Sequence, residues 1–456
     1  MTAATVAPGA GVIAATNGTV DGRERKPVLL GALCILISIL PAFSVAPGPL
    51  KSNGSPAKIL SVLLFGLAVL GFVAARRTAA RRSVRPGVVI IVLFFFLQLT
   101  IYAIGLTNDG SSLVEASKTR ALISLVANVG VALYAFARVR TARQRDFVLG
   151  CLAIGLAFGC FVGLMQSLTS IDLRYLFEPP GFVQNVESDT TDLAERFGAK
   201  RVMGTSQHAI EFSVVSVAAM ALTLYFARHT ARPVVRIGAL IAFVIALVAM
   251  PASVSRSGVI ALAAAVALYV WNVKVRHLAV GIVAAALAVG AYMQMLPSVA
   301  SALWNTIINS EEDPSIMSRT SDYALVSKTF HAHPIAGLGL GASPPAEYGY
   351  LDNQWLQAVV QGGLIGVAAM VLLTAGGFFG IAAALRRATN QRERDQAYTL
   401  GAIFVATMAC SFTFDLFAFE QASRILFLIV ALLWCDFSSP LDEPVAAPAG
   451  SSQAPD

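Results

Sequence analysis

The sequence predicts an all-α, polytopic membrane protein with about twelve transmembrane helices. Of its 456 residues, 56% are hydrophobic and only 13% are charged, whereas soluble domains carry roughly 25% charged residues. Apolar runs of about 20 residues recur along the chain, and this length is enough to cross the hydrocarbon core of a bilayer. The Lys and Arg residues gather in short clusters between these runs, as they do in the cytoplasmic linkers of membrane proteins.

Twelve apolar runs account for most of the chain. The run at 354–385 is long for one span, so we expect its first part at the membrane interface. Residues 28–437 are therefore predicted to form one membrane domain, between a disordered N-terminus (1–27) and a disordered tail (438–456). The runs cover residues 28–46, 59–75, 87–106, 121–137, 147–168, 209–227, 236–252, 257–272, 277–296, 354–385, 397–415 and 424–437.

The basic clusters predict the orientation. We expect a protein of the bacterial inner membrane with both termini in the cytoplasm. Each short basic linker then also lies in the cytoplasm, as the positive-inside rule requires. Two longer segments, 169–208 and 297–353, then lie outside the membrane, and long loops of this kind usually carry function. The cytoplasmic clusters are Arg23, Arg25, Lys26; Arg76, Arg77, Arg81, Arg82, Arg85; Arg138, Arg140, Arg143, Arg145; Arg228, Arg232, Arg236; Lys274, Arg276; and Arg386, Arg387, Arg392, Arg394.

Composition also argues against several classes of function. The formal net charge of +7 does not predict nucleic-acid binding, because the basic residues follow the topology. All five cysteines fall within apolar segments, so we expect neither a disulfide framework nor a metal cluster. The spans are poor in charge, which disfavours a secondary transporter, since transporters place ionisable groups near the bilayer midplane.

Three arginines on the predicted outer face are candidates for binding an anion. Arg256 lies in a tight turn, Pro251 to Gly258, where small hydroxyl residues open the next helix. Helix N-termini and Arg side chains both favour bound phosphate. Arg201 precedes Val202-Met203-Gly204, and Arg319 opens a helical-looking stretch in the second long loop. Each arginine also fits a simpler role, as a membrane-edge anchor or as part of a surface helix.

The remaining candidates lie between residues 331 and 357. His331 and His333 stand two residues apart and do not share a helix face, so no metal site is expected. The glycine-rich stretch Pro334 to Gly341 lacks the known nucleotide-binding patterns and predicts a flexible or re-entrant loop. Asp352 stands at the outer mouth of the tenth run. It fits either a helix N-cap or a group that orients or deprotonates a sugar hydroxyl.

At these residues the chain resembles the bacterial O-antigen ligase and polysaccharide polymerase superfamily. The signature extends from about residue 196 to 370, and its five parts occur in the family's order on the predicted outer face. They are an Arg-Xaa-Xaa-Gly stretch (Arg201 to Gly204), a Ser-Arg-Ser-Gly turn (Ser255 to Gly258), a large loop with Arg319, a His-Pro-Xaa-Xaa-Gly-Xaa-Gly stretch (His333 to Gly339), and Asp352 to Gln357 followed by Gly363 to Gly366.

The resemblance implies a metal-independent, cofactor-free, inverting glycosyltransferase. Its donor would be a glycan on undecaprenyl diphosphate, with Arg201, Arg256 and Arg319 neutralising the diphosphate. Asp352 and His333 would be catalytic, and the acceptor would meet Asn353 and Gln357. Ligases of this family carry a histidine where this chain has Asp352, so the resemblance favours a polymerase, which would work beside a flippase and a chain-length regulator. A ligase remains the alternative in the same class, and a transporter or flippase in another.

Overall fold

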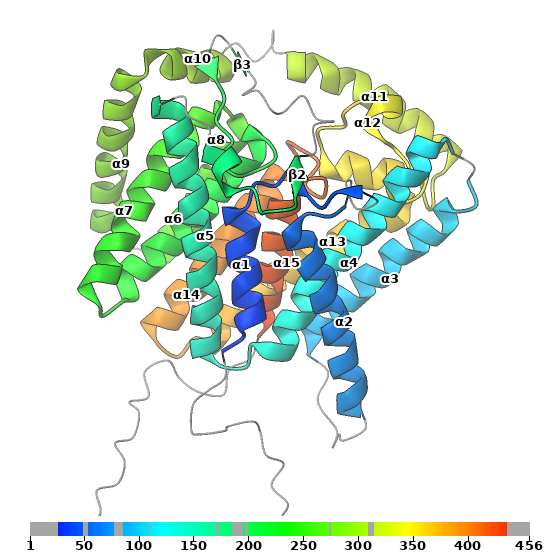
Figure 1. Ribbon diagram of the computed structural model, residues 1–456, viewed down its shortest axis with the longest axis horizontal. Coiled ribbons are helices and arrows are strands. Elements are labelled where there is room, and N and C mark those ends of the chain that lie inside the picture. Colours follow the sequence, from blue (N-terminus) through cyan, green and yellow to red (C-terminus); the bar gives the residue numbers. More distant parts are fainter. Residues whose placement is uncertain are drawn as a thin grey trace, which may run out of the picture.

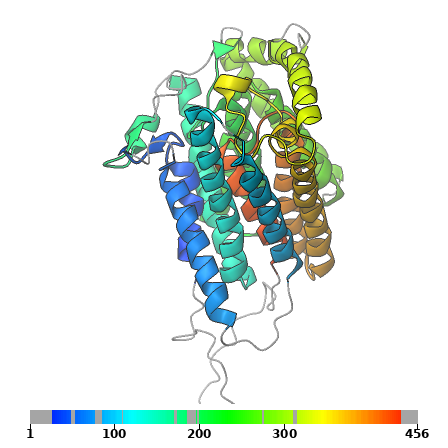
Figure 2. The ribbon, with the colours of Figure 1, turned by 90° about the vertical axis from the view of Figure 1, so that its right-hand side faces the viewer.

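The computed structural model describes residues 26–48, 53–76, 85–108, 110–169, 173–184, 195–196, 199–272, 275–308 and 314–435. These residues are mostly helical, and the long helices lie side by side in one bundle (Figure 1). Figure 2 shows the same helices from the side, with several short elements across one end of the bundle. This end, at the top of Figure 1, carries α10 (Pro297–Ile308) and α11 (Pro314–Ala332) and is called the upper end below.

The helices follow the predicted apolar runs closely, and each run contains a helix. The helices of the bundle are α1 (Val28–Ile39), α2 (Pro56–Arg76), α3 (Pro86–Gly105), α4 (Ser112–Arg138), α5 (Ala142–Thr169), α6 (Ala209–His229), α7 (Pro233–Ala249), α8 (Arg256–Tyr269), α9 (Val275–Met295), α13 (Gln354–Arg387), α14 (Gln391–Cys410) and α15 (Glu420–Trp434).

In the part of the chain that the structure describes, seven helices are long and apolar enough to cross a membrane: α2, α3, α4, α5, α6, α13, and α7 together with the turn that follows it. Helices α1, α8 and part of α9 are apolar but shorter. The all-α membrane fold is therefore confirmed, while the number of twelve spans stays a prediction. Large apolar side chains on the outer surface of α7, such as Val234 and Ile241, are exposed, as expected for a surface in contact with lipid.

Helix α15 occupies the centre of the bundle (Figure 1). It packs against α3, α4, α6, α13 and α14, and every residue from Gln421 to Leu433 is buried. A helix that is apolar on all sides is expected in such a position. Its N-terminus points to the upper end, where the carboxylate of Glu211 accepts hydrogen bonds from the backbone N–H groups of Gln421 (2.9 Å) and Ala422 (3.0 Å).

The two long segments predicted outside the membrane contain short elements at the upper end. Residues 297–353 form α10, α11 and α12 (Pro345–Tyr348), so this segment is largely helical. In the first segment, η2 (Leu173–Phe177) is followed by β2 (Val183–Gln184), which pairs antiparallel with β1 (Ser44–Val45). Strands β3 (Glu195–Arg196) and β4 (Ala199–Lys200) form a second antiparallel pair. The expected disorder at 1–27 and 438–456 lies outside the described residues, apart from Lys26 and Pro27.

Charged side chains near the ends of several helices form ion pairs between helices. Asp395 of α14 is buried and accepts from His229 (2.6 Å) and Arg228 (3.1 Å) of α6. Asp146 of α5 forms an ion pair of 2.8 Å with Arg392 of α14. These pairs lie outside the predicted apolar runs, so they do not contradict the expectation that the spans are poor in charge.

Candidate functional site

The structure brings the Arg201 segment against the turn that carries Arg256. The backbone N–H of Val202 donates to the carbonyl of Ala252 (3.2 Å), and the Arg201 Nε donates to the carbonyl of Ser253 (3.1 Å). Val202, Ala252 and Val254 are buried in one small apolar cluster. The segments of two predicted anion-binding arginines, far apart in the sequence, are therefore neighbours. We call residues 201–204 and 250–258 together the arginine turns.

Close packing explains the glycines of these two motifs. Gly204 has a φ of +55°, and a Cβ there would lie 2.6 Å from the carbonyl oxygen of Gly159. A Cβ on Gly258, in the first turn of α8, would lie 2.8 Å from the Cβ of Ser213 on α6. The turn itself, which begins with η4 (Met250–Ser253), is strained at Val254, whose φ is +47°. Such a conformation costs a non-glycine residue about 1–3 kcal/mol and often occurs at functional sites.

The third arginine stays a prediction. Arg319 belongs to α11, at the upper end of the molecule. Its side chain lies outside the described part of the structure, so its approach to the arginine turns is not tested.

The glycine-rich stretch Pro334 to Gly341 is a loop, as predicted, and it packs against α13 through backbone hydrogen bonds. Helix α13 is kinked at Gly363, which has a φ of +53°. Before the kink, the carbonyls of Val360 and Gln361 accept from the N–H groups of the two residues that follow Gly337 (both 2.9 Å). After the kink, two helix N–H groups donate to the carbonyls of the first two residues of the stretch (2.9 and 3.1 Å). The stretch thus satisfies the backbone groups that the kink leaves open.

The N-cap of α13 is Asn353 and not Asp352. The Asn353 Oδ1 accepts from the backbone N–H groups of Trp355 (2.8 Å) and Leu356 (3.2 Å). Asp352 precedes the cap and is partly exposed. The capping explanation for Asp352 is therefore wrong, because the side chain one residue later has the geometry that an N-cap needs.

Residues 411–419, between α14 and α15, connect the Arg256 turn to the start of α13. We call them the central loop. The hydroxyl groups of Thr413 and Ser257 share a hydrogen bond of 2.8 Å, and Ser257 directly follows Arg256. On the other side, the carbonyl and hydroxyl of Ser411 accept from the Gln354 backbone N–H (2.8 Å) and from the Trp355 indole (2.9 Å). The two parts of the predicted site are therefore held to one loop.

The central loop also carries a carboxyl group that the sequence analysis missed. Asp415 receives a hydrogen bond from the Gln357 side chain, and its pKa is raised to about 6, first by burial and also by the negative charge of Asp352. The only signal in the sequence is a lone carboxylate between aromatic residues, at the end of a run that we interpreted as a span. The structure brings it to the residues that the resemblance assigns to the acceptor.

A cavity of about 350 Å³ opens beside the central loop. It lies among α2, α3, α4, α13 and the start of α15, and its volume is within the range of small-molecule sites, about 300–1,000 Å³. Gln357 lines it and is held by Ser343 and Gln361, with distances of 3.0 Å to each. Its ionisable lining residues are Lys58, Arg120, Asp415 and Glu420.

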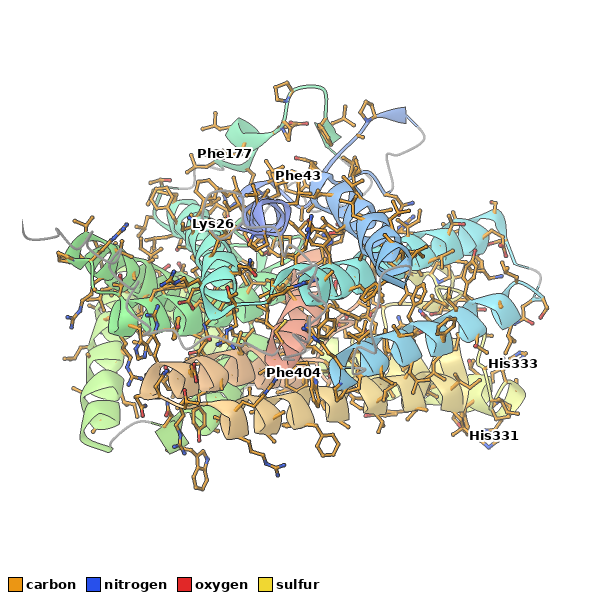
Figure 3. All side chains as sticks on the ribbon, turned by 90° about the horizontal axis from the view of Figure 1, so that it is seen from below. Lys26, Phe43, Phe177, His331, His333 and Phe404 are labelled. Carbon is orange, nitrogen blue, oxygen red and sulfur yellow. The ribbon has the colours of Figure 1, made fainter. Side chains whose placement is uncertain are left out.

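The two histidines lie away from this cavity. His331 ends α11 and its Nδ1 lies 2.7 Å from the carbonyl oxygen of Ser327, while His333 is exposed just after the helix. Figure 3 shows both at the periphery of the molecule, far from the red central helix. A catalytic role of His333 stays a prediction, and the geometry gives it less support than Asp352. Within the described residues, no group of three or more His, Cys, Asp or Glu residues is arranged to hold a metal ion.

The sequence comparison covers the middle of this site. Residues 241–371 match the family model of O-antigen ligase. The match includes Arg256, Asp352, Gln357 and the kink of α13, but neither Arg201 nor Asp415. No curated protein matches this sequence. The matched part of the chain is thus similar to O-antigen ligases, which supports the resemblance to the O-antigen ligase-like superfamily.

Proposed function

We propose that this protein is a membrane glycosyltransferase that polymerises lipid-linked repeat units of an exopolysaccharide or O-antigen. One observation carries the proposal: the central loop is hydrogen-bonded both to the Arg256 turn and to the start of α13. In this proposal the Arg256 turn, on one side of the loop, would bind an anion, while Asp352, next to the start of α13, and Asp415, in the loop itself, would act on the acceptor. The similarity to O-antigen ligases supports this class of activity.

The donor in this proposal is a glycan linked to undecaprenyl diphosphate. Arg201 and Arg256, with Arg319, would bind the diphosphate, because guanidinium groups form paired hydrogen bonds to phosphate oxygens. They would stabilise the negative charge that develops on the leaving group as the bond to the sugar breaks. Neutralisation by arginine would replace the divalent metal that soluble sugar transferases often use.

The acceptor in this proposal is a sugar hydroxyl beside Asp352 and Gln357. Its oxygen attacks the anomeric carbon of the donor, the bond from that carbon to the diphosphate oxygen breaks, and the anomeric configuration inverts. Asp352 accepts the hydroxyl proton or orients the hydroxyl by a hydrogen bond. Asp415, whose pKa is raised to about 6, supplies a second carboxyl group, and such pairs divide acid and base roles between two environments.

A ligase is the second candidate, and the description of the matched family favours it. In that case the finished glycan would be transferred to lipid A core or another acceptor. Against this, Asp352 stands where the resemblance expects the histidine of a ligase. A transporter or flippase gains no comparable support, because the candidate residues gather near the upper end and not at the middle of the spans.

The proposal includes a location and partners. The protein would be a multi-pass protein of the bacterial inner membrane with both termini in the cytoplasm. A flippase would deliver the donor to the outer face, and a regulator would set the chain length. Lateral access from the bilayer to the arginine turns would let the lipid diphosphate enter.

Deletion of the gene tests the proposed function. The lipid-linked glycans of the deletion strain would be extracted, and their length would be measured by gel electrophoresis and mass spectrometry. A polymerase predicts that single repeat units accumulate on the lipid carrier and that the plasmid-borne gene restores long chains. Long chains retained on the carrier would indicate a ligase. Unchanged amounts and lengths of lipid-linked and mature glycan would overturn both.

A further inference from the structure

The cavity beside the central loop is lined by amide side chains. Gln98 of α3, Asn128 of α4, Gln207, and three glutamines of α13 (Gln354, Gln357 and Gln361) border it. Amides carry both donors and acceptors, and such groups are suited to the hydroxyls of a sugar. Apolar residues such as Phe94, Leu340 and Phe417 complete the wall.

Two of these amides are oriented by side-chain hydrogen bonds that use the carbonyl oxygen only. Gln354 accepts from the backbone N–H of Phe417 (2.7 Å), and Gln207 accepts from that of Glu420 (3.2 Å). Neither amide nitrogen donates to another residue in the part of the chain that the structure describes. These fixed donors at the cavity wall are therefore available to a ligand.

Two basic residues, Lys58 and Arg120, line the cavity together with the carboxyl groups of Asp415 and Glu420, and the two basic residues differ in their partners. Lys58 and Arg424 both bind the carboxylate of Glu420, with Arg424 at 2.8 Å. Arg120 of α4, by contrast, is exposed at the cavity and makes no hydrogen bond or ion pair with any residue of the described ranges. Arg120 is thus a cation at the cavity whose charge no described residue pairs, whereas Lys58 is paired with Glu420, and Arg120 can attract an anion into the cavity.

We propose that this cavity binds the acceptor glycan and that Arg120 recognises a carboxylate on it, so that the repeat unit is an acidic sugar chain. The proposal rests on the proposed function. The arginine turns lie across the central loop from the cavity, where Thr413 contacts Ser257, and they are assigned to the diphosphate. Asp415 lies on the cavity wall, beside the position where an acceptor hydroxyl would be activated.

A binding experiment tests the role of Arg120. The full-length protein in nanodiscs would be titrated with digalacturonate, with its neutral counterpart galactobiose, and with inorganic pyrophosphate, and followed by saturation-transfer NMR. The variants are Arg120→Gln and, as a control, Arg236→Gln, which replaces an exposed arginine of α7 outside the cavity. Both positions are on helix surfaces, where glutamine is well tolerated.

The expected result is selective. Arg120→Gln weakens digalacturonate binding roughly tenfold to hundredfold, as expected for one charge-assisted contact, while galactobiose binding and all Arg236→Gln values stay within twofold of wild type. Four outcomes would overturn the proposal: no digalacturonate binding to the wild type, equal weakening of both sugars, no effect of Arg120→Gln, or loss of pyrophosphate binding in that variant. The last would assign Arg120 to the donor. Because the readout is binding, it stays separate from the glycan-length test of the proposed function.

Discussion

The carboxylate of Asp352 interacts electrostatically with the carboxyl group of Asp415. Asp352 precedes α13, whereas Asp415 lies in the central loop. After burial, the negative charge of Asp352 is a further cause that raises the pKa of Asp415, to about 6, while the hydrogen bond from Gln357 opposes this effect. Asp415 can therefore hold a proton under mildly acidic conditions, in which a carboxyl group of ordinary pKa is ionised.

Asp352→Asn is expected to be expressed and inserted normally and to lower the polymerisation rate by about 10²–10⁴-fold, the usual range for general-base assistance. The amide keeps the shape of the side chain but cannot accept the proton. The measurement is the distribution of glycan chain lengths in a deletion strain that carries the variant. Wild-type lengths would exclude Asp352 as the base and leave His331 and His333 to be tested.

The matched control for that variant is Asn353→Ala. Because Asn353 caps α13, its loss should cost about 1 kcal/mol of stability. The protein should therefore melt at a lower temperature while Asp352 keeps its carboxylate. If Asp352→Asn lowers the melting temperature as much as Asn353→Ala does, the effect of Asp352→Asn is structural.

The pH dependence of stability should depend on Asp415. Its pKa is about 6 in the folded protein and 3.8 ordinarily, so the folded state holds this proton more tightly than the unfolded state does. The resulting stabilisation is fully present below about pH 4 and is lost as the pH rises through about 6. In Asp415→Asn, melting temperatures measured across this interval should lack the decrease with rising pH that the titration of Asp415 causes.

Asp352→Asn should in turn lower the pKa of Asp415, because removal of a nearby negative charge favours the ionised form. Infrared spectroscopy of the protonated carboxyl band, identified by its absence in Asp415→Asn, measures this shift. A band that titrates at the same pH in Asp352→Asn and in wild type would contradict the interaction between the two residues.

Much of the bundle could be predicted because lipid imposes a simple rule on sequence. A span needs an apolar run of sufficient length, and each predicted run contains a helix. Arg201 and Arg256 were also recognisable as candidates, since helix N-termini and guanidinium groups favour bound phosphate. That their segments meet, as in the contact between Arg201 and Ser253, is seen only in the structure.

The remaining features depend on contacts between distant segments, which a single sequence does not encode in its spacing. Asp415 looks isolated in the sequence, and only the return of the central loop to α13 places it beside Gln357. The role of Asp352 was uncertain for a similar reason: Asp and Asn both cap helices, and only the geometry assigns the cap to Asn353. The stretch around Gly339 looked flexible because glycines favour loops, whereas here they permit close packing.

Gly363→Ala should destabilise the protein strongly. Its φ of +53° is unfavourable for alanine, and an added Cβ would lie 2.5 Å from the carbonyl oxygen of Pro334. Since both atoms belong to packed backbone, the clash is not relieved by a rotamer change, and we expect a loss of at least about 1–3 kcal/mol. Gly238→Ala on α7 is the control, because no atom lies near its Cβ position and alanine favours helices. Equal melting temperatures of both variants would argue against the packed kink.

The predicted orientation can be tested with two introduced cysteines, because all five native cysteines are buried. Tyr350 is 76% exposed near the upper end, and Ala231 is exposed between α6 and α7. In cells with a permeabilised outer membrane, a membrane-impermeant thiol reagent should label Tyr350→Cys, while Ala231→Cys should react only after lysis. The reverse pattern would place the site on the cytoplasmic side and contradict the proposed function. Ser310, in the same predicted outer segment, would serve equally by sequence but lies outside the described residues.

Arg256→Lys should reduce polymerisation roughly tenfold to hundredfold at equal expression, although the charge is kept. Lysine cannot form the paired hydrogen bonds of a guanidinium group, and one charge-assisted contact contributes about 1.5–3 kcal/mol. An arginine that served only as a membrane anchor would accept lysine with little change in yield. Arg236→Lys on α7 is the control and should show such a small change. The measurement is the yield of long chains per amount of membrane protein in the complemented deletion strain. Equal yields from Arg256→Lys, Arg236→Lys and wild type would show that Arg256 does not bind the diphosphate through paired guanidinium hydrogen bonds. The binding site for the donor would then have to lie elsewhere.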